Sequence, residues 1–111
     1  MRTPVTTDTH SPASAADTAR TRALNDRLRT TGQGGAIVLS LGLHLSGDDV
    51  IEQALRMVAG DRPTSTLHDS GRVAKAEVDL EWRIVWFASD ETAAPMPVLT
   101  VMFAAELIAL E

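Results

Sequence analysis

Apolar and polar residues alternate most regularly between positions 78 and 86. The apolar positions are Val78, Leu80, Trp82, Ile84 and Trp86. Because successive side chains of a strand point to opposite faces, this pattern predicts a strand with both tryptophans on its buried face. Residues 71–75 are predicted to be its hairpin partner, although the turn between them lacks the Asn-Gly or Asp-Gly pair of a tight hairpin.

A helix is predicted over residues 17–31. Leu24 and Leu28 lie four positions apart among good helix formers. Gly32 is predicted to end this helix, since glycine adopts the left-handed conformation after a last turn without a Cβ penalty. The glycines that follow do not suit a phosphate loop, because such a loop runs from a strand through glycine into a helix.

The apolar run over residues 36–45 predicts a buried strand with His44 at its end. A second helix is predicted over residues 50–59, where apolar residues recur at spacings of three and four. Ser46 and Asp49 have the spacing of a capping box at its start. Residues 61–70 are polar and are predicted to form the longest ordered loop.

Residues 98–110 are apolar almost all around a helical wheel, with only Thr100 and Glu106 as interruptions. This pattern predicts a C-terminal helix whose second face lies at an interface, and a homodimer through this helix is one candidate assembly. A central core helix is the alternative. The run is shorter than the about 20 residues that a bilayer span requires, so we expect no membrane contact.

Together these elements predict an α+β domain with the order α-β-α-β-β-α, in which about three helices cover a small, mostly antiparallel sheet. A chain of 111 residues is enough for one domain. Residues 1–15 are rich in Thr, Ser, Pro and Asp and are predicted to be a disordered tail before a single domain over residues 16–111. No apolar stretch in this region is typical of a secretory signal, so we expect a cytoplasmic location.

The net charge of −5 is distributed unevenly along the chain. Residues 1–35 carry five arginines against three aspartates, whereas the remainder carries 5 basic and 12 acidic residues. An acidic body disfavours direct nucleic-acid binding, which draws its affinity from Lys and Arg on phosphates. It is compatible with a cationic protein as partner.

Candidate catalytic chemistry is sparse. The chain has no cysteine, which excludes a disulfide, a thiolate metal site and a cysteine nucleophile. His68 and Asp69, with nearby acids, could form a general base or a metal site, but a His-Asp pair in a loop is more typical of turn chemistry. We therefore expect a protein that is not an enzyme and has no cofactor or metal, and keep a small hydrolase around His68 as a third hypothesis.

Five short sequence blocks follow one another within residues 20–107. They are Arg22-Ala23-Leu24-Asn25-Asp26 with Leu28-Arg29, Thr31-Gly32-Gln33-Gly34-Gly35, His68-Asp69-x-Gly71, Trp82-Arg83-Ile84, and Val98-Leu99-Thr100-Val101-Met102 with Ala105-Glu106. This series resembles a small proteobacterial domain family of unknown function whose members are often encoded on plasmids and other mobile elements. The resemblance implies an origin in mobile DNA but no reaction, cofactor or catalytic residue. The chain departs from the family at Arg83, Val85 and Trp86-Phe87, where the family has lysine, aspartate and two tyrosines.

The leading functional hypothesis is a non-enzymatic protein-binding module. Its most specific version is a mobile-element inhibitor of a host defence nuclease, an anti-CRISPR or anti-restriction protein, whose carboxylates occupy a cationic channel in place of phosphates. The candidate partner-binding residues are Glu77, Asp79, Glu81 and Arg83. The alternative is a nucleic-acid-binding accessory protein whose first helix presents a solvated basic face to phosphates. The residues of that face are Arg20, Arg22, Arg27 and Arg29.

Overall fold

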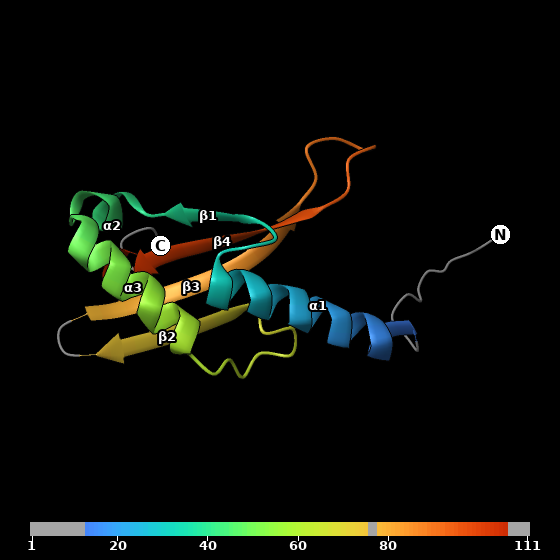
Figure 1. Ribbon diagram of the computed structural model, residues 1–111, viewed down its shortest axis with the longest axis horizontal. Helices are drawn as coiled ribbons and strands as arrows, with labels where there is room; N and C mark the ends of the chain where they lie inside the picture. The colour runs from blue at the N-terminus through green and yellow to red at the C-terminus, as the bar shows by residue number, and fades with distance from the viewer. Residues whose placement is uncertain (1–12, 76–77, 107–111) are drawn as a thin grey trace.

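The computed structural model describes residues 13–75 and 78–106, which form one sheet with helices packed against it (Figure 1). The elements along the chain are α1 (Ala13–Thr31), β1 (Ala36–Leu39), α2 (Leu41–Leu45), α3 (Asp48–Gly60), β2 (Ser70–Lys75), β3 (Val78–Phe87) and β4 (Met96–Phe103). Residues 104–106 are helical again. None of the described helices is both long and apolar enough to cross a membrane.

The strands form a mixed sheet in the order β1-β4-β3-β2. β3 pairs antiparallel with both β2 and β4, whereas β1 pairs parallel with β4. The α+β class is therefore confirmed. The predicted order of elements and the count of three helices are matched only in part, because the chain adds α2 after β1 and forms the strand β4 where the last helix is predicted.

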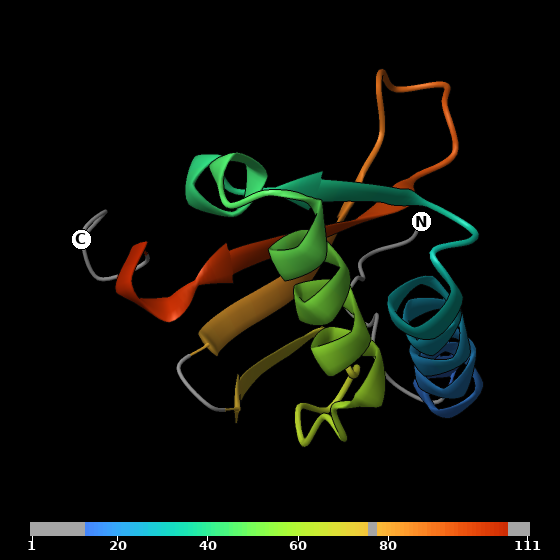
Figure 2. The same ribbon diagram turned by 60° about the vertical axis from the view of Figure 1, so that its left-hand side comes forward.

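The alternating segment forms β3 as predicted. Leu80, Trp82 and Ile84 are buried, and the polar residues between them lie on the opposite face. The predicted hairpin partner is β2, whose register places Val73 opposite Leu80. Helices α1 and α3 lie on the face that holds these buried residues, as the two ribbon views agree (Figures 1 and 2).

Residues 98–103 belong to a strand, not to the predicted helix. β4 lies between β1 and β3, so it has a neighbour on each side. Its sequence is apolar on both faces, because Val98 and Met102 lie opposite the buried Leu99 and Val101, and a helical wheel cannot distinguish that pattern from a buried helix. The β-branched residues Val98, Thr100 and Val101 favour the strand. Residues 107–110 lie outside the described residues, and the homodimer stays a prediction.

The first strand is shorter than predicted. β1 ends at Leu39, and Ser40 begins α2, because its Oγ accepts a hydrogen bond from the Leu43 N–H at 3.2 Å. A strand reaching residue 45 would place alternate leucines on one face, but in α2 only Leu43 is buried. His44 consequently lies in a helix and not at a strand end.

The first two predicted helices are present, with changes at their starts. α1 begins at Ala13, so residues 13–15 are helical where a disordered tail is predicted, and residues 1–12 lie outside the described residues. Gly32 has φ +77° and donates its N–H to the Leu28 carbonyl at 2.8 Å, which confirms it as the helix stop. α3 starts after Gly47 without a side-chain cap, so the predicted capping box is wrong.

The hydrophobic core joins the sheet to the helices. Its buried members are Leu28, Leu43, Ala54, Val58, Leu80, Trp82, Ile84, Leu99 and Val101. They come from α1, α2, α3, β3 and β4, so each of these elements is held by apolar contacts. Burying one large aliphatic side chain contributes about 1.5–3 kcal/mol.

The Glu106 carboxylate joins the end of β4 to α2. It accepts hydrogen bonds from the Ser40 hydroxyl at 2.6 Å, the Gly42 N–H at 3.0 Å and the Phe103 N–H at 2.9 Å. These donors, the Ser40 hydroxyl above all, hold the pKa of Glu106 below its ordinary value, because they stabilise the charged form. A Cβ at Gly42 would lie 2.5 Å from the Glu106 Oε2, so a side chain there would displace the carboxylate from its present position.

Glu106→Gln is expected to lower the free energy of unfolding by about 1–2 kcal/mol at neutral pH, because an amide cannot accept all three bonds as a carboxylate does. A lowered folded pKa stabilises the fold above the ordinary glutamate pKa, and this contribution is lost as the pH falls through the folded pKa. Urea unfolding should therefore show that the wild type and Glu106→Gln differ in free energy of unfolding at neutral pH, and that this difference becomes smaller at acidic pH. The exposed Glu91 provides the control, Glu91→Gln. Equal stability of Glu106→Gln and the wild type at neutral pH would contradict this assignment.

Candidate functional site

One side of α1 carries a polar stripe that holds the loop over residues 61–69 and the end of α3. Its members are Arg22, Asn25, Asp26 and Arg29. Their spacing of three and four positions places them on one side of the helix. The sequence analysis places two of these arginines on a solvated face, whereas the structure directs them toward the protein.

Arg29 is buried, with 9% of its surface exposed, which corrects its assignment to a solvated basic face. Its Nη1 donates to the carbonyls of Val58, Ala59 and Asp61 at 3.0, 2.9 and 2.8 Å. Its Nη2 donates to the Asp26 Oδ1 at 3.2 Å. A helix leaves its last carbonyls without intrahelical donors, so Arg29 supplies the donors that the end of α3 needs.

The same guanidinium lies over the Trp82 ring, 5.5 Å from its centroid. The Trp82 Nε1–H donates to the Asp61 Oδ2 at 2.7 Å. A Cβ at Gly71 would lie 2.3 Å from that oxygen and 2.6 Å from the indole nitrogen. Glycine in β2 therefore allows Trp82 and Asp61 to meet, and this contact connects the sheet to the segment that follows α3.

The polar stripe also holds three successive residues of the loop. Arg22 Nε donates to the Thr66 carbonyl, Asn25 Nδ2 donates to the Leu67 carbonyl at 2.9 Å, and the His68 Nδ1 lies 3.1 Å from each Asp26 carboxylate oxygen. Asn25 is buried and accepts the Trp86 Nε1–H at 3.0 Å, so the second tryptophan is tied to α1 as well. The loop is thus positioned by side chains and not only by its own turns.

His68 has φ +55°, a conformation that is uncommon for residues other than glycine. Its carboxylate partner is Asp26 of α1, not the neighbouring Asp69 of the sequence hypothesis. Among the hydrogen bonds of the described residues, no serine or threonine hydroxyl reaches the His68 ring. Within residues 13–75 and 78–106, no group of three His, Asp or Glu side chains is placed to hold a metal ion.

The predicted partner-binding residues do not form an acidic patch in the described chain. Arg72 binds Asp79 across the hairpin with its Nε on Oδ1 at 3.0 Å and its Nη2 on Oδ2 at 2.7 Å. This pair lowers the pKa of Asp79 and raises that of Arg72. Glu81 and Arg83 share the same sheet face, and Glu77 lies outside the described residues. The described part of this face holds two carboxylates and two guanidinium groups.

The sheet face opposite α1 and α3 is here called the uncovered sheet face, because no described helix lies on it (Figures 1 and 2). Beside the charged residues it carries an apolar cluster. Its members are Val38, Val85, Phe87 and Met96, exposed by 48, 43, 57 and 46%. Phe87 pairs with Met96 between β3 and β4, and Val38 pairs with Thr100 between β1 and β4, so the cluster crosses three strands.

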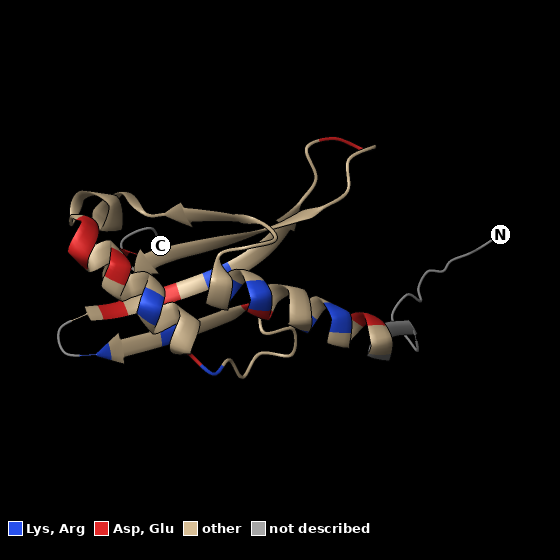
Figure 3. Cartoon of the chain, in the orientation of Figure 1, with Lys and Arg blue, Asp and Glu red and all other residues tan. Residues whose placement is uncertain are grey.

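The four arginines of the nucleic-acid hypothesis are divided by the structure. Arg20 and Arg27 are exposed. Arg22 and Arg29 instead donate to backbone carbonyls of the loop and of α3. Basic residues are spread along α1 in Figure 3, but they do not all face solvent together. A phosphate-contacting face would retain only the two exposed members.

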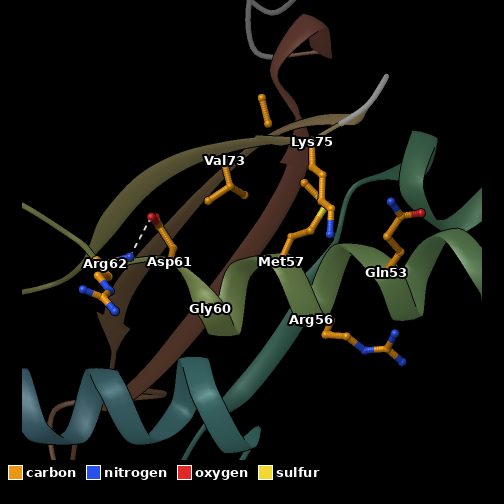
Figure 4. A pocket seen from close by; sticks show the side chains of 9 residues that line it. Gln53, Arg56, Met57, Gly60, Asp61, Arg62, Val73 and Lys75 are labelled. Carbon is orange, nitrogen blue, oxygen red and sulfur yellow. Dashed lines mark hydrogen bonds between the residues drawn. The ribbon is translucent and has the colours of Figure 1, made fainter.

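Sequence analysis misses a groove of about 830 Å³ between α3 and β2 (Figure 4). Met57 and Val73 supply apolar side chains, and three cations line it: Arg56, Arg62 and Lys75. Among the residues that the structure describes, Asp61 is the lining carboxylate. The signal that could have revealed the groove is that three of the five basic residues after position 35 gather there in an acidic part of the chain.

Comparison of the chain with protein-family models, with curated proteins and with solved structures gives no match. The resemblance to the mobile-element family stays a prediction.

Arg29→Met is expected to lower the free energy of unfolding by about 2–4 kcal/mol, because three carbonyls at the end of α3 lose their charged donor. Arg29→Lys should retain part of the stability, since an ammonium cannot reproduce the planar fork. The exposed Arg27 on the same helix provides the matched control, Arg27→Met, which should change stability by no more than about 0.5 kcal/mol. Urea unfolding followed by tryptophan fluorescence measures all three variants. Equal stabilities of Arg29→Met and Arg27→Met would refute the role assigned to Arg29.

Proposed function

We propose that this protein is a non-enzymatic protein-binding module that docks on a partner protein through its uncovered sheet face. The observation that carries the proposal is the apolar cluster on that face, whose members are 43–57% exposed. Exposed apolar patches with polar surroundings mark interaction sites on soluble domains. The described helices all lie on the opposite face of the sheet or at its end. A bound partner would therefore cover the uncovered sheet face.

The cluster has the features of an interface centre. Phe87 supplies a large aromatic side chain, and aromatic residues are enriched where binding energy concentrates. Val38 and Met96 extend the apolar area across β1 and β4. A sheet face of this kind packs well against a second sheet or a helix, and either arrangement removes the exposed apolar surface from water.

The charged residues form a polar rim at the other end of this face. Arg72 and Asp79 neutralise each other, while Glu81 and Arg83 add one charge of each sign. Charges of both signs favour selection of a complementary partner more than raw affinity. Inhibition of a defence nuclease by phosphate mimicry remains the specific version of the proposal, but these charges support it less than an acidic excess would. We therefore centre the interface on the apolar cluster.

The double variant Val85→Glu/Phe87→Glu is expected to weaken partner binding at least about tenfold, because charge replaces the apolar centre of the interface. The matched control is Leu41→Glu/Leu45→Glu, which changes two leucines that are 70 and 73% exposed on α2. Each tagged form is used to purify partners from a bacterial lysate at low and moderate salt, followed by mass spectrometry. The wild type and the control should enrich the same partner, which is then purified for titration.

Retention of that partner by Val85→Glu/Phe87→Glu would refute the proposal, as would the absence of any enriched protein. Light scattering adds a separate criterion. If the wild type has twice the monomer mass and Phe87→Glu has the monomer mass, then the partner at this face is a second copy of this chain. Loss of binding on Asp79→Ala/Glu81→Ala alone would shift the interface from the apolar cluster to the carboxylates.

A further inference from the structure

The edge of the sheet at β2 has no strand partner within the described residues. The Ile84 N–H donates to the Asp69 carbonyl at 2.7 Å, so residues 69 and 84 form a hydrogen-bonded pair. Such pairs alternate along an antiparallel ladder. The N–H and C=O groups of Arg72 and Ala74 therefore point away from β3, toward the open edge.

The groove between α3 and β2 adjoins this edge. Ala74 lines the groove although its register with Asp79 places its side chain toward the uncovered sheet face. Its backbone is therefore the part that borders the groove. On the helix-facing side of β2, Val73 and Lys75 line the groove together with Met57 of α3. An open strand edge and an apolar floor thus occur side by side.

The charges along the groove are mainly positive. Arg62 lies at one end, whereas Arg56 and Lys75 lie toward the other (Figure 4). Asp61 is the opposing carboxylate, and its two oxygens accept the Trp82 Nε1–H and the Arg62 backbone N–H. These three cations belong to a chain with a net charge of −5. The groove is therefore a local site for a negatively charged ligand.

Arg56 also contacts Glu52 at 3.1 Å, but the two side chains are 74 and 70% exposed. An exposed ion pair of this kind contributes little and is exchanged easily for another carboxylate. The cations are distributed over the length of the groove, so one compact anion cannot meet all of them. An extended chain with several carboxylates can do so.

We propose that this groove binds an extended acidic segment of a partner protein, which adds to β2 as a fifth strand. The peptide backbone pairs with the outward groups of Arg72 and Ala74. Alternate side chains then point into the groove, where apolar ones contact Met57 and Val73 and carboxylates reach Arg62 and Lys75. The groove is separate from the uncovered sheet face, so this proposal does not depend on the function proposed above.

The test uses selection from a phage-displayed library of random peptides about twelve residues long on the immobilised full chain. Selected peptides should combine acidic and apolar residues, and a labelled synthetic copy is then titrated by fluorescence polarisation. The variant Arg62→Glu/Lys75→Glu should weaken binding at least about tenfold. The matched control is Arg20→Glu/Arg27→Glu, which makes the same charge change on α1 and should leave the affinity within about twofold.

A backbone variant tests strand addition itself. Ala74→Pro removes an outward N–H without removing a bond of the β2–β3 ladder, and it should abolish peptide binding while circular dichroism and melting stay close to the wild type. Ala74→Val keeps the N–H and should bind normally. If Ala74→Pro does not fold, strand addition is tested by amide hydrogen exchange of the wild type. Bound peptide should then slow the exchange of the Arg72 and Ala74 amides.

Several results would overturn the proposal. Selection of basic peptides, or of none, would do so, as would an affinity unchanged by Arg62→Glu/Lys75→Glu. If only the variant Val85→Glu/Phe87→Glu loses peptide binding, the peptide binds the uncovered sheet face and not the groove. Binding of inorganic phosphate or ATP to the groove, without any selected peptide, would identify a site for a compact anion.

Discussion

The Arg29 guanidinium is the contact on which the arrangement of the helices over the sheet depends. A buried charge is costly unless acceptors surround it, and Arg29 has three carbonyls, one carboxylate and the Trp82 ring around it. These groups belong to α1, the end of α3 and β3, so one side chain fixes their mutual distance. The groove depends on the same contact, because Asp61, which lines it, accepts from Arg29 through its carbonyl and from Trp82 through its carboxylate.

The sequence was sufficient to predict the elements whose two sides differ in polarity. β3 alternates strictly, α1 and α3 repeat their apolar residues at helical spacing, and Gly32 ends α1 with a positive φ. Prediction failed where both sides of an element are apolar, because periodicity then carries no information. β4 is apolar on both faces and therefore resembles an apolar helix in sequence. In α2 the leucines alternate by chance with the period of a strand, although the segment is helical.

The candidate surfaces were harder to predict from the sequence than the fold was. The polar stripe on α1 looks solvated because its partners are backbone carbonyls, which have no signature in the side-chain pattern. His68 meets Asp26 at a sequence separation of 42, and no local pattern in the sequence indicates that contact. Asp79 and Glu81 lie on the polar side of β3, yet the neutralisation of Asp79 by Arg72 follows from the hairpin register and not from composition.

The central place of β4 has a consequence for how this chain folds as it is synthesised. β1 leaves the ribosome early, but its strand neighbour in the sheet is β4, whose residues emerge about sixty positions later. Until then, β1 has no ladder to join, and the β2–β3 hairpin is a two-stranded unit without its central neighbour. We therefore expect a nascent chain interrupted before residue 96 to leave the edges of β1 and β3 unpaired, and unpaired edges of this kind favour aggregation and proteolysis.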